Sequence, residues 1–254
     1  MRLSQSILIL VLLATVSSCN SQTSQHRIEI VPPTIEQEAS SIWRTINDIT
    51  FLEEQGYTIR LPEDPLIDSL IVKSKNGSFG NEDFSAIYTL VETGIFNPID
   101  YQKAMERVNN QIDLIQTLVN EIDSKRSEWD WNFNMFDTYQ ILFTLYGTGG
   151  SYDPDKGTVT LLTNQEGGFM NYENPANTII HEITHMGLES SIVQRHNLSH
   201  GMKERVVDTF VYLMFKDKLP EYKIQNMGNT EIDSYLKTKA DLASLNAIVS
   251  KFSD

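Results

Sequence analysis

The stretch that decides the fold of this chain runs from residue 174 to residue 196 and reads NPANTIIHEITHMGLESSIVQRH. Asn174 and Pro175 predict the start of a helix, because asparagine caps a first turn well and proline suits the first helical position. Apolar residues then recur at a spacing that would bury one face of this helix, namely Ile179, Ile180, Ile183 and Met186. His181 and His185 are four residues apart, so both imidazoles lie on one helical face and can bind the same ion.

The segment His181-Glu182-Ile183-Thr184-His185 matches the H-E-x-x-H pattern that is typical of zinc hydrolases. Glu182 follows the first histidine and projects to one side of the helix. There it can accept a proton from a metal-bound water without being a ligand itself. Histidine is scarce in this chain, with five in 254 residues, so a chance match is rare. The alternative is a helix whose two histidines are ordinary polar residues.

A catalytic zinc site needs a third protein ligand, with the fourth position left to water. The sequence offers Glu189, His196, His200 and Glu204. Glu189 would place three ligands in a row along one helix axis, and such a row cannot close around one ion. His196 would need an unusual loop. His200 shares a helical face with Glu204 and stays open as an alternative ligand, as a donor to the reaction intermediate, or as a residue at a helix start.

Glu204 and Asp208 begin and end the segment Glu204-Arg205-Val206-Val207-Asp208 on a later predicted helix. Together with the H-E-x-x-H segment, this one resembles the gluzincins, the thermolysin-like metallopeptidases, which carry E-x-x-x-D on a second helix. The resemblance covers roughly residues 140–220. It implies that Glu204 is the third zinc ligand and that Asp208 orients His181 through the other ring nitrogen, a contact that fixes the tautomer of a ligand.

This assignment makes a geometric demand on the metal-binding helix. At about 1.5 Å per residue, a helix running straight to His196 would turn back too far beyond His185 for Glu204 to reach the ion. We therefore predict that the helix ends or bends near residues 187–191.

The N-terminus carries an apolar run at residues 7–16, followed by Ser17, Ser18 and Cys19. The run is too short to span a bilayer comfortably. This arrangement resembles a bacterial lipoprotein signal, in which the cysteine becomes the lipidated first residue of the mature protein. The resemblance implies a signal peptide at residues 1–18, a membrane anchor on Cys19 and a tether at residues 19–33, with the protein exported to the bacterial cell envelope. A buried free thiol is the alternative for Cys19.

The composition limits which kinds of partner the protein can bind. The net charge of −14 argues against a nucleic-acid partner, because such a partner requires a basic patch. At 254 residues the chain is long enough for one large domain or two small ones.

The pattern of the whole chain predicts an α+β, predominantly helical fold. We expect an N-terminal helical region at residues 34–130 and a zincin-like catalytic region at residues 131–254. A strand at 136–147 and a strand at 158–163 flank strong turn signals and predict a β-hairpin directly before the metal-binding helix. By resemblance, an edge strand in this place binds extended substrate through its backbone. The expected helices lie at residues 35–55, 65–75, 81–94, 97–125, 199–216 and 231–250.

The functional hypothesis from the sequence is peptide-bond hydrolysis with one Zn²⁺ ion and Glu182 as general base. Donors for the oxyanion are expected among Tyr146, Tyr152, Tyr172 and His200. Two alternatives stay open: a lipoprotein that binds zinc or a partner protein without catalysis, and a zinc amidase acting on a cell-wall component.

Overall fold

The computed structural model describes residues 26–252 of the chain. The expected signal peptide, residues 19–25 of the expected tether and the lipidation site at Cys19 lie outside the described residues. Among residues 26–252, no helix combines the length and the hydrophobicity that crossing a bilayer requires.

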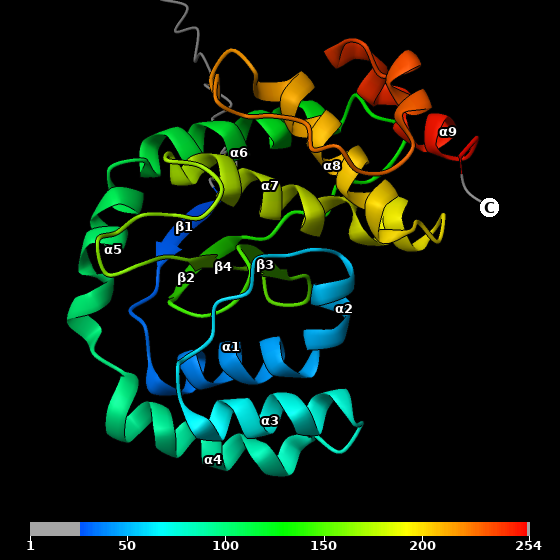
Figure 1. The fold of residues 1–254 in the computed structure, drawn as a ribbon. Helices are drawn as coiled ribbons and strands as arrows, with labels where there is room; N and C mark the ends of the chain where they lie inside the picture. Colours follow the sequence, from blue (N-terminus) through cyan, green and yellow to red (C-terminus); the bar gives the residue numbers. More distant parts are fainter. Residues whose placement is uncertain (1–25, 253–254) are drawn as a thin grey trace, which may run out of the picture.

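A four-stranded mixed sheet lies at the centre of the fold (Figure 1). Its strands are β1 (Arg27–Ile30), β2 (Thr138–Thr144), β3 (Gly150–Asp153) and β4 (Thr158–Leu162), in the spatial order β1-β2-β4-β3. β1 pairs in parallel with β2, and β2 pairs in parallel with β4. β3 pairs antiparallel with β4 and forms the edge of the sheet.

The expected hairpin between residues 136–147 and 158–163 is wrong in its pairing, since β2 and β4 run parallel. Parallel neighbours need a long crossover, and residues 145–157 supply it. Gly147 and Gly149 adopt positive φ angles of 141° and 153°, which lets the chain reverse and form β3 as a strand of its own. The hairpin that precedes the helix of His181 and His185 is therefore β3–β4.

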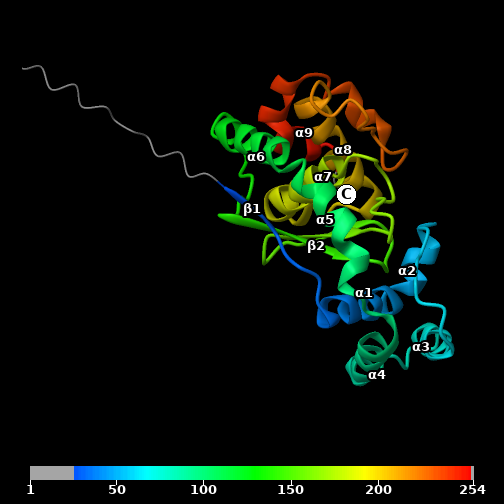
Figure 2. The same cartoon turned by 90° about the vertical axis from the view of Figure 1, so that its left-hand side faces the viewer.

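Helices cover both faces of this sheet (Figures 1 and 2). One layer holds the helices that supply most of the larger hydrophobic core. Its members are α6 (Ile112–Arg126), α7 (Pro175–Leu188), α8 (His200–Phe215) and α9 (Leu245–Val249), with α5 (Gln102–Asn109) at its side. Every residue of α7 except His181 is buried, which places this helix at the centre of the protein.

The opposite layer consists of the first four helices, which enclose a second, smaller core. They are α1 (Ile35–Asn47), α2 (Ile49–Glu54), α3 (Pro65–Lys75) and α4 (Phe84–Leu90). The short segments η1 (Asn81–Asp83) and η2 (Val91–Ile95) flank α4. The buried residues of α5 and α6 belong to the larger core instead, although both helices lie within the expected helical region 34–130.

Two side chains fasten the first helical layer to the sheet. Glu38 of α1 is buried and accepts a hydrogen bond from the backbone N–H of Leu145 at 2.9 Å. Arg60 donates to the carbonyl of Thr163 at 2.8 Å and forms an isolated β-bridge with Gly147. These contacts hold the first helical layer against the residues that follow β2 and β4, at one end of the sheet.

Three expected helices are divided in the structure. The segment expected as one helix at residues 35–55 consists of α1 and α2, with a break at Asp48. The segment expected as one helix at residues 97–125 consists of η3 (Pro98–Tyr101), α5 and α6, with a turn at residues 110–111. Asn109 and Asn110 favour this turn because asparagine side chains compete with the helical backbone.

The expected helix at residues 231–250 is divided into η5 (Thr230–Ser234), η6 (Lys239–Ser244) and α9. Asp241 accepts hydrogen bonds from the backbone and hydroxyl of Thr238, which caps a new helical start there.

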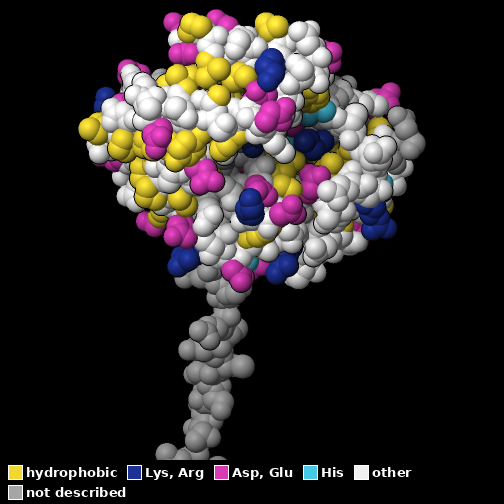
Figure 3. All heavy atoms as spheres, turned by 90° about the horizontal axis from the view of Figure 1, so that it is seen from below, with side chains coloured by type: hydrophobic (Ala, Val, Ile, Leu, Met, Phe, Trp, Pro, Cys, Tyr) yellow, Lys and Arg dark blue, Asp and Glu magenta, His cyan; other side chains and the backbone are white. Residues whose placement is uncertain are grey.

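On the surface viewed in Figure 3, Lys and Arg side chains are scattered among Asp and Glu rather than gathered into a basic patch.

Gly187 provides a test of the packing around α7. A Cβ atom at this position would lie 2.0 Å from the ring of Phe133, which is fully buried. We expect Gly187→Ala to lower the free energy of unfolding by about 1–3 kcal/mol through overpacking, as measured by denaturant unfolding. The matched control is Gly94→Ala, where nothing lies within 4 Å of the added methyl group. Equal stability of the two variants would contradict this account.

Candidate metal centre

Helix α7 presents His181, Glu182 and His185 from its second and third turns. The helix starts where the sequence predicts, because the Asn174 side chain accepts a hydrogen bond from the Ala176 N–H at 2.9 Å. Its contacts with β3, β4, α6 and α8 fix its position in the fold. The Nε2 atoms of the two histidines lie 3.0 Å apart, so both rings point into the same space.

Helix α8 brings the third group. Ser199 caps this helix by accepting a hydrogen bond from the Met202 N–H. Oε2 of Glu204 lies 3.4 Å from Nε2 of His181 and 3.3 Å from Nε2 of His185. The three ligand atoms lie within 4.8 Å of one another, and the group could hold a metal ion. All three side chains are at most 12% exposed.

The end of α7 differs in part from the geometric expectation. α-Helical pairing stops at Leu188, within the interval 187–191 where an end or bend is expected. The chain does not turn back there; it winds on as a π-helix, Glu189–Gln194, before the turn at Asn197, whose φ is 48°. Glu204 still lies within 3.4 Å of both histidines, although the chain stays helical to Gln194.

Asp208 lies beside the first histidine. Its Oδ1 is 3.1 Å from Nδ1 of His181. The Tyr222 hydroxyl lies 2.7 Å from the same Nδ1 and donates to Oδ1 of Asp208 at 2.7 Å. Gln225 donates its backbone N–H to the other carboxylate oxygen at 2.8 Å. These contacts fix the ring of His181 so that Nε2 faces Glu204.

Sequence reasoning missed Tyr222. It lies in an irregular segment after α8 and carries no motif that would single it out. Its only signal is its position shortly after the end of the helix expected at residues 199–216. Tyr222 contacts His181 and Asp208 because the segment after α8 folds back over that helix.

The other third-ligand candidates have different partners. Glu189 accepts hydrogen bonds from Tyr152 and Gln194. His196 lies 2.9 Å from the Asn246 side chain. His200 places Nδ1 3.8 Å from Oε1 of Glu204, while its Nε2 lies 2.8 Å from the Tyr57 hydroxyl. None of these three belongs to the cluster of converging ligand atoms.

Tyr57 is a second residue that the sequence did not indicate. It follows α2 and reaches across to α8, where its ring lies edge-on to the imidazole of His200. Burial raises the pKa of the Tyr57 hydroxyl to about 12, and the charges of Glu204 and Glu182 add to the shift. The hydroxyl therefore keeps its proton at neutral pH.

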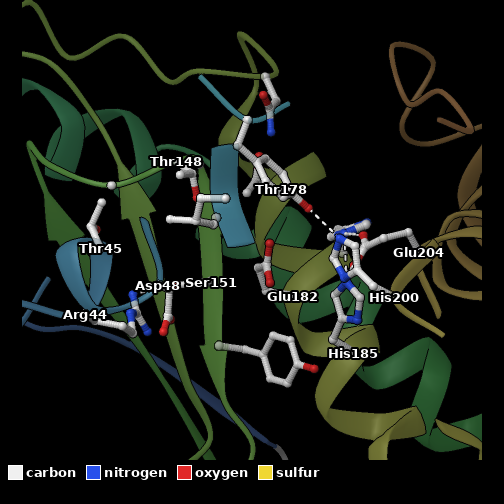
Figure 4. A pocket seen from close by; sticks show the side chains of 18 of the residues that line it. Arg44, Thr45, Asp48, Thr148, Ser151, Thr178, Glu182, His185, His200 and Glu204 are labelled. Atoms are coloured by element: carbon white, nitrogen blue, oxygen red, sulfur yellow. Dashed lines mark hydrogen bonds and ion pairs between the residues drawn. The ribbon is translucent and has the colours of Figure 1, made fainter. Parts of the chain in front are cut away.

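A pocket of about 400 Å³ opens onto the cluster (Figure 4). All four side chains expected as oxyanion donors line it: Tyr146, Tyr152, Tyr172 and His200. The Tyr152 ring stacks on His185 at 4.9 Å, and its hydroxyl is bound to Glu189. The Tyr172 hydroxyl donates to the Lys223 carbonyl at 3.3 Å. The hydroxyls of Tyr152 and Tyr172 thus already donate to protein acceptors that do not line the pocket.

Glu182 lies against the edge strand. A Cβ atom at Gly150 of β3 would lie 2.3 Å from Oε1 of Glu182 and 2.6 Å from Cγ2 of Thr178, so a larger residue there would displace one of these side chains. Burial raises the pKa of Glu182 to about 7; His181 opposes this rise, and Glu204 adds to it. The carboxyl lines the pocket without joining the ligand cluster.

The charges of the cluster are strongly coupled. Burial opposes the charged form of His181, but its contacts with Asp208 and Glu204 outweigh burial and raise its pKa to about 10. Burial lowers the pKa of His185 to about 4. Burial opposes ionisation of Glu204, yet both histidines hold its pKa well below the usual range. The protonated His181 can therefore donate a hydrogen bond from its Nε2–H to Nε2 of a neutral His185, which accounts for two Nε2 atoms 3.0 Å apart.

The converging lone pairs of two imidazoles and one carboxylate need a positive charge between them. A proton on His181 supplies it in the absence of a cation, and a divalent metal ion supplies it better. Two nitrogens and one carboxylate oxygen form a donor set that suits zinc and related first-row metals. The residues present therefore fit a bound metal ion.

Removal of Glu204 tests the ligand set. We expect Glu204→Ala to weaken binding of a divalent metal ion by more than about a hundredfold, since even residues that only support metal ligands contribute 10–100-fold. Metal content and chelator competition measure the loss. Glu189→Ala is the matched control and should keep its metal. Unchanged metal content in the Glu204 variant would move the third ligand to His200.

The pH dependence of metal binding follows from the raised pKa of His181. Below about pH 10 this ring holds a proton that a metal ion must expel, so affinity rises with pH. We expect roughly a tenfold gain per pH unit between pH 7 and pH 9. Below about pH 7 the slope should steepen, because a cation also favours loss of the proton on Glu182. Chelator competition at several pH values measures this slope, and a flat profile would refute the assignment.

The comparisons with known proteins found no match: no protein-family model, no curated protein and no solved structure matches the chain.

Proposed function

We propose that this protein is a zinc-dependent metallopeptidase. The observation that carries the proposal is the place of Glu182, a buried carboxyl beside the ligand cluster that is not itself a ligand. A purely structural metal site has no use for such a base. Its pKa of about 7 is suited to proton transfer at neutral pH.

In the proposed mechanism, His181, His185 and Glu204 hold the ion. Bound zinc supplies Lewis acidity that activates water and polarises a carbonyl group. Glu182 accepts the proton of the attacking water and passes it to the leaving amine. Asp208 and Tyr222 keep the ring of His181 in its ligating orientation.

The position of the edge strand β3 is the argument for a peptide as the substrate. Its residues Gly150, Ser151 and Tyr152 line the pocket, and β3 pairs with β4 on one side only among the described strands. An extended peptide can add to such an edge through backbone hydrogen bonds. The hydrogen-bonded pair of Tyr57 and His200 lines the same pocket and is our assignment for the oxyanion contact.

The lipid anchor at Cys19 and export to the bacterial cell envelope are part of the same proposal. They rest on the sequence of residues 1–19 alone, since these residues lie outside the described part of the chain.

Glu182→Gln tests the proposal directly. We expect the variant to keep its zinc and its fold while hydrolysis of a generic peptide library falls by about 10²–10⁴-fold. Mass spectrometry of the cleaved peptides gives the readout, and metal analysis confirms loading. The control is Glu173→Gln, because the Glu173 side chain is 87% exposed and lies just before the start of α7.

A wild-type protein with stoichiometric zinc that cleaves no peptide would refute peptidase activity. Co-purification of a partner protein would then favour the non-catalytic binding function, and cleavage of cell-wall fragments would favour the amidase.

A further inference from the structure

The pocket continues beyond the metal cluster to the first helical layer. Arg44 and Asp48 of the α1–α2 corner line it, as do Phe51 and Tyr57. In Figure 4, Arg44 lies across the pocket from His185 and Glu204, with Glu182 between them. The pocket therefore gives a substrate held at the metal room to reach Arg44, which contacts β3 through Ser151.

The guanidinium of Arg44 is held by a neutral group. Its Nη2 donates to the Ser151 hydroxyl on β3 at 2.8 Å. Among residues 26–252, no carboxylate lies within 4.0 Å of it. Arg44 is nevertheless close enough to Glu182 to stabilise its charged form. Its remaining N–H donors are thus available to a ligand in a pocket whose far wall holds the reactive groups.

The other charged groups at this end of the pocket are less suited to bind a ligand. The Lys203 ammonium lies 5.6 Å from the centroid of the Tyr152 ring and 3.4 Å from its hydroxyl. Asp48 accepts a hydrogen bond from the Asn47 side chain at 2.8 Å. Within the pocket, Arg44 is the cation with a planar donor fork, which matches a carboxylate in two parallel hydrogen bonds.

The charge balance of the pocket points in the same direction. A divalent ion would offset the negative charges of Glu182 and Glu204. Arg44 and Lys203 then outnumber Asp48, so the pocket lining is net positive in a chain whose overall charge is −14. An anionic substrate gains from this local field.

We propose that Arg44, held on Ser151, binds a carboxylate of the substrate, so that the protein prefers acidic peptides. The carboxylate belongs either to an Asp or Glu side chain a short distance from the cleaved bond or to the C-terminus of the peptide. This inference rests on the proposed peptidase function and names its substrate class.

The experiment compares matched peptides with wild-type protein and Arg44→Gln. One series exchanges Glu for Gln at each position around a cleaved bond, and a second series exchanges a free C-terminus for an amide. A hydrogen bond to a charged group contributes about 1.5–3 kcal/mol, so we expect kcat/KM to favour the acidic peptide by about 10–100-fold in the wild type. In Arg44→Gln this ratio should fall to near one, mainly through KM.

Arg27→Gln is the matched control, because Arg27 is an exposed residue of β1 that pairs with Glu29 and does not line the pocket. Arg44→Lys should retain part of the preference, since the charge remains and the planar fork is lost. The series in which the ratio falls identifies the source of the carboxylate.

The outcomes separate this inference from the proposed function. Cleavage of acidic and neutral peptides at equal rates would overturn the assignment of substrate class while peptidase activity stands. A preference that persists in Arg44→Gln and disappears in Lys203→Met would move the carboxylate to Lys203 and overturn the role of Arg44. A wild-type protein that cleaves no peptide of either series would remove both proposals together.

Discussion

The convergence of Glu204 on two histidines from another helix is the constraint on which the rest of this structure depends. Two imidazole nitrogens 3.0 Å apart and a carboxylate oxygen 3.3–3.4 Å from each cannot coexist in a buried place without a proton or a cation between them. The contact fixes α8 against α7. It also sets the coupled charges of the cluster, with one histidine protonated and the other neutral in the absence of a metal.

Supporting groups around the cluster come from segments that are far apart in the chain. Tyr222 returns over α8 to share Nδ1 of His181 with Asp208. Gly150 allows the edge strand to approach Glu182, and Gly187 allows Phe133 to pack against α7. The small size of these two glycines therefore matters more than their backbone freedom. Each permits a close approach that the position of a reactive or buried group requires.

The first helical layer gives the pocket its second wall. Glu38 and Arg60 bind this layer to the end of the sheet, and the layer then contributes Arg44 and Tyr57 to the pocket. In the proposed reaction, α7 and α8 supply the metal ligands and the base, and Tyr57 of the first layer joins His200 at the oxyanion contact. Arg44 of α1 and the edge strand β3 line the rest of the pocket. This division explains how a helical region without a recognisable motif can take part in the selection of a substrate.

The sequence by itself determined the local features of the site. The cap at Asn174, the spacing of His181 and His185, and the placement of Glu204 and Asp208 on one later helix are all encoded in neighbouring residues, and the structure has them where they were expected. Only the tertiary structure decided the parallel pairing of β2 with β4, the π-helix after Leu188 and the division of three expected helices. It also brought Tyr222 to His181, and Tyr57 and Arg44 to the pocket. The physical reason is that capping and periodicity depend on residues within a few turns, whereas strand pairing and contacts across a pocket depend on how the whole chain buries its apolar surface.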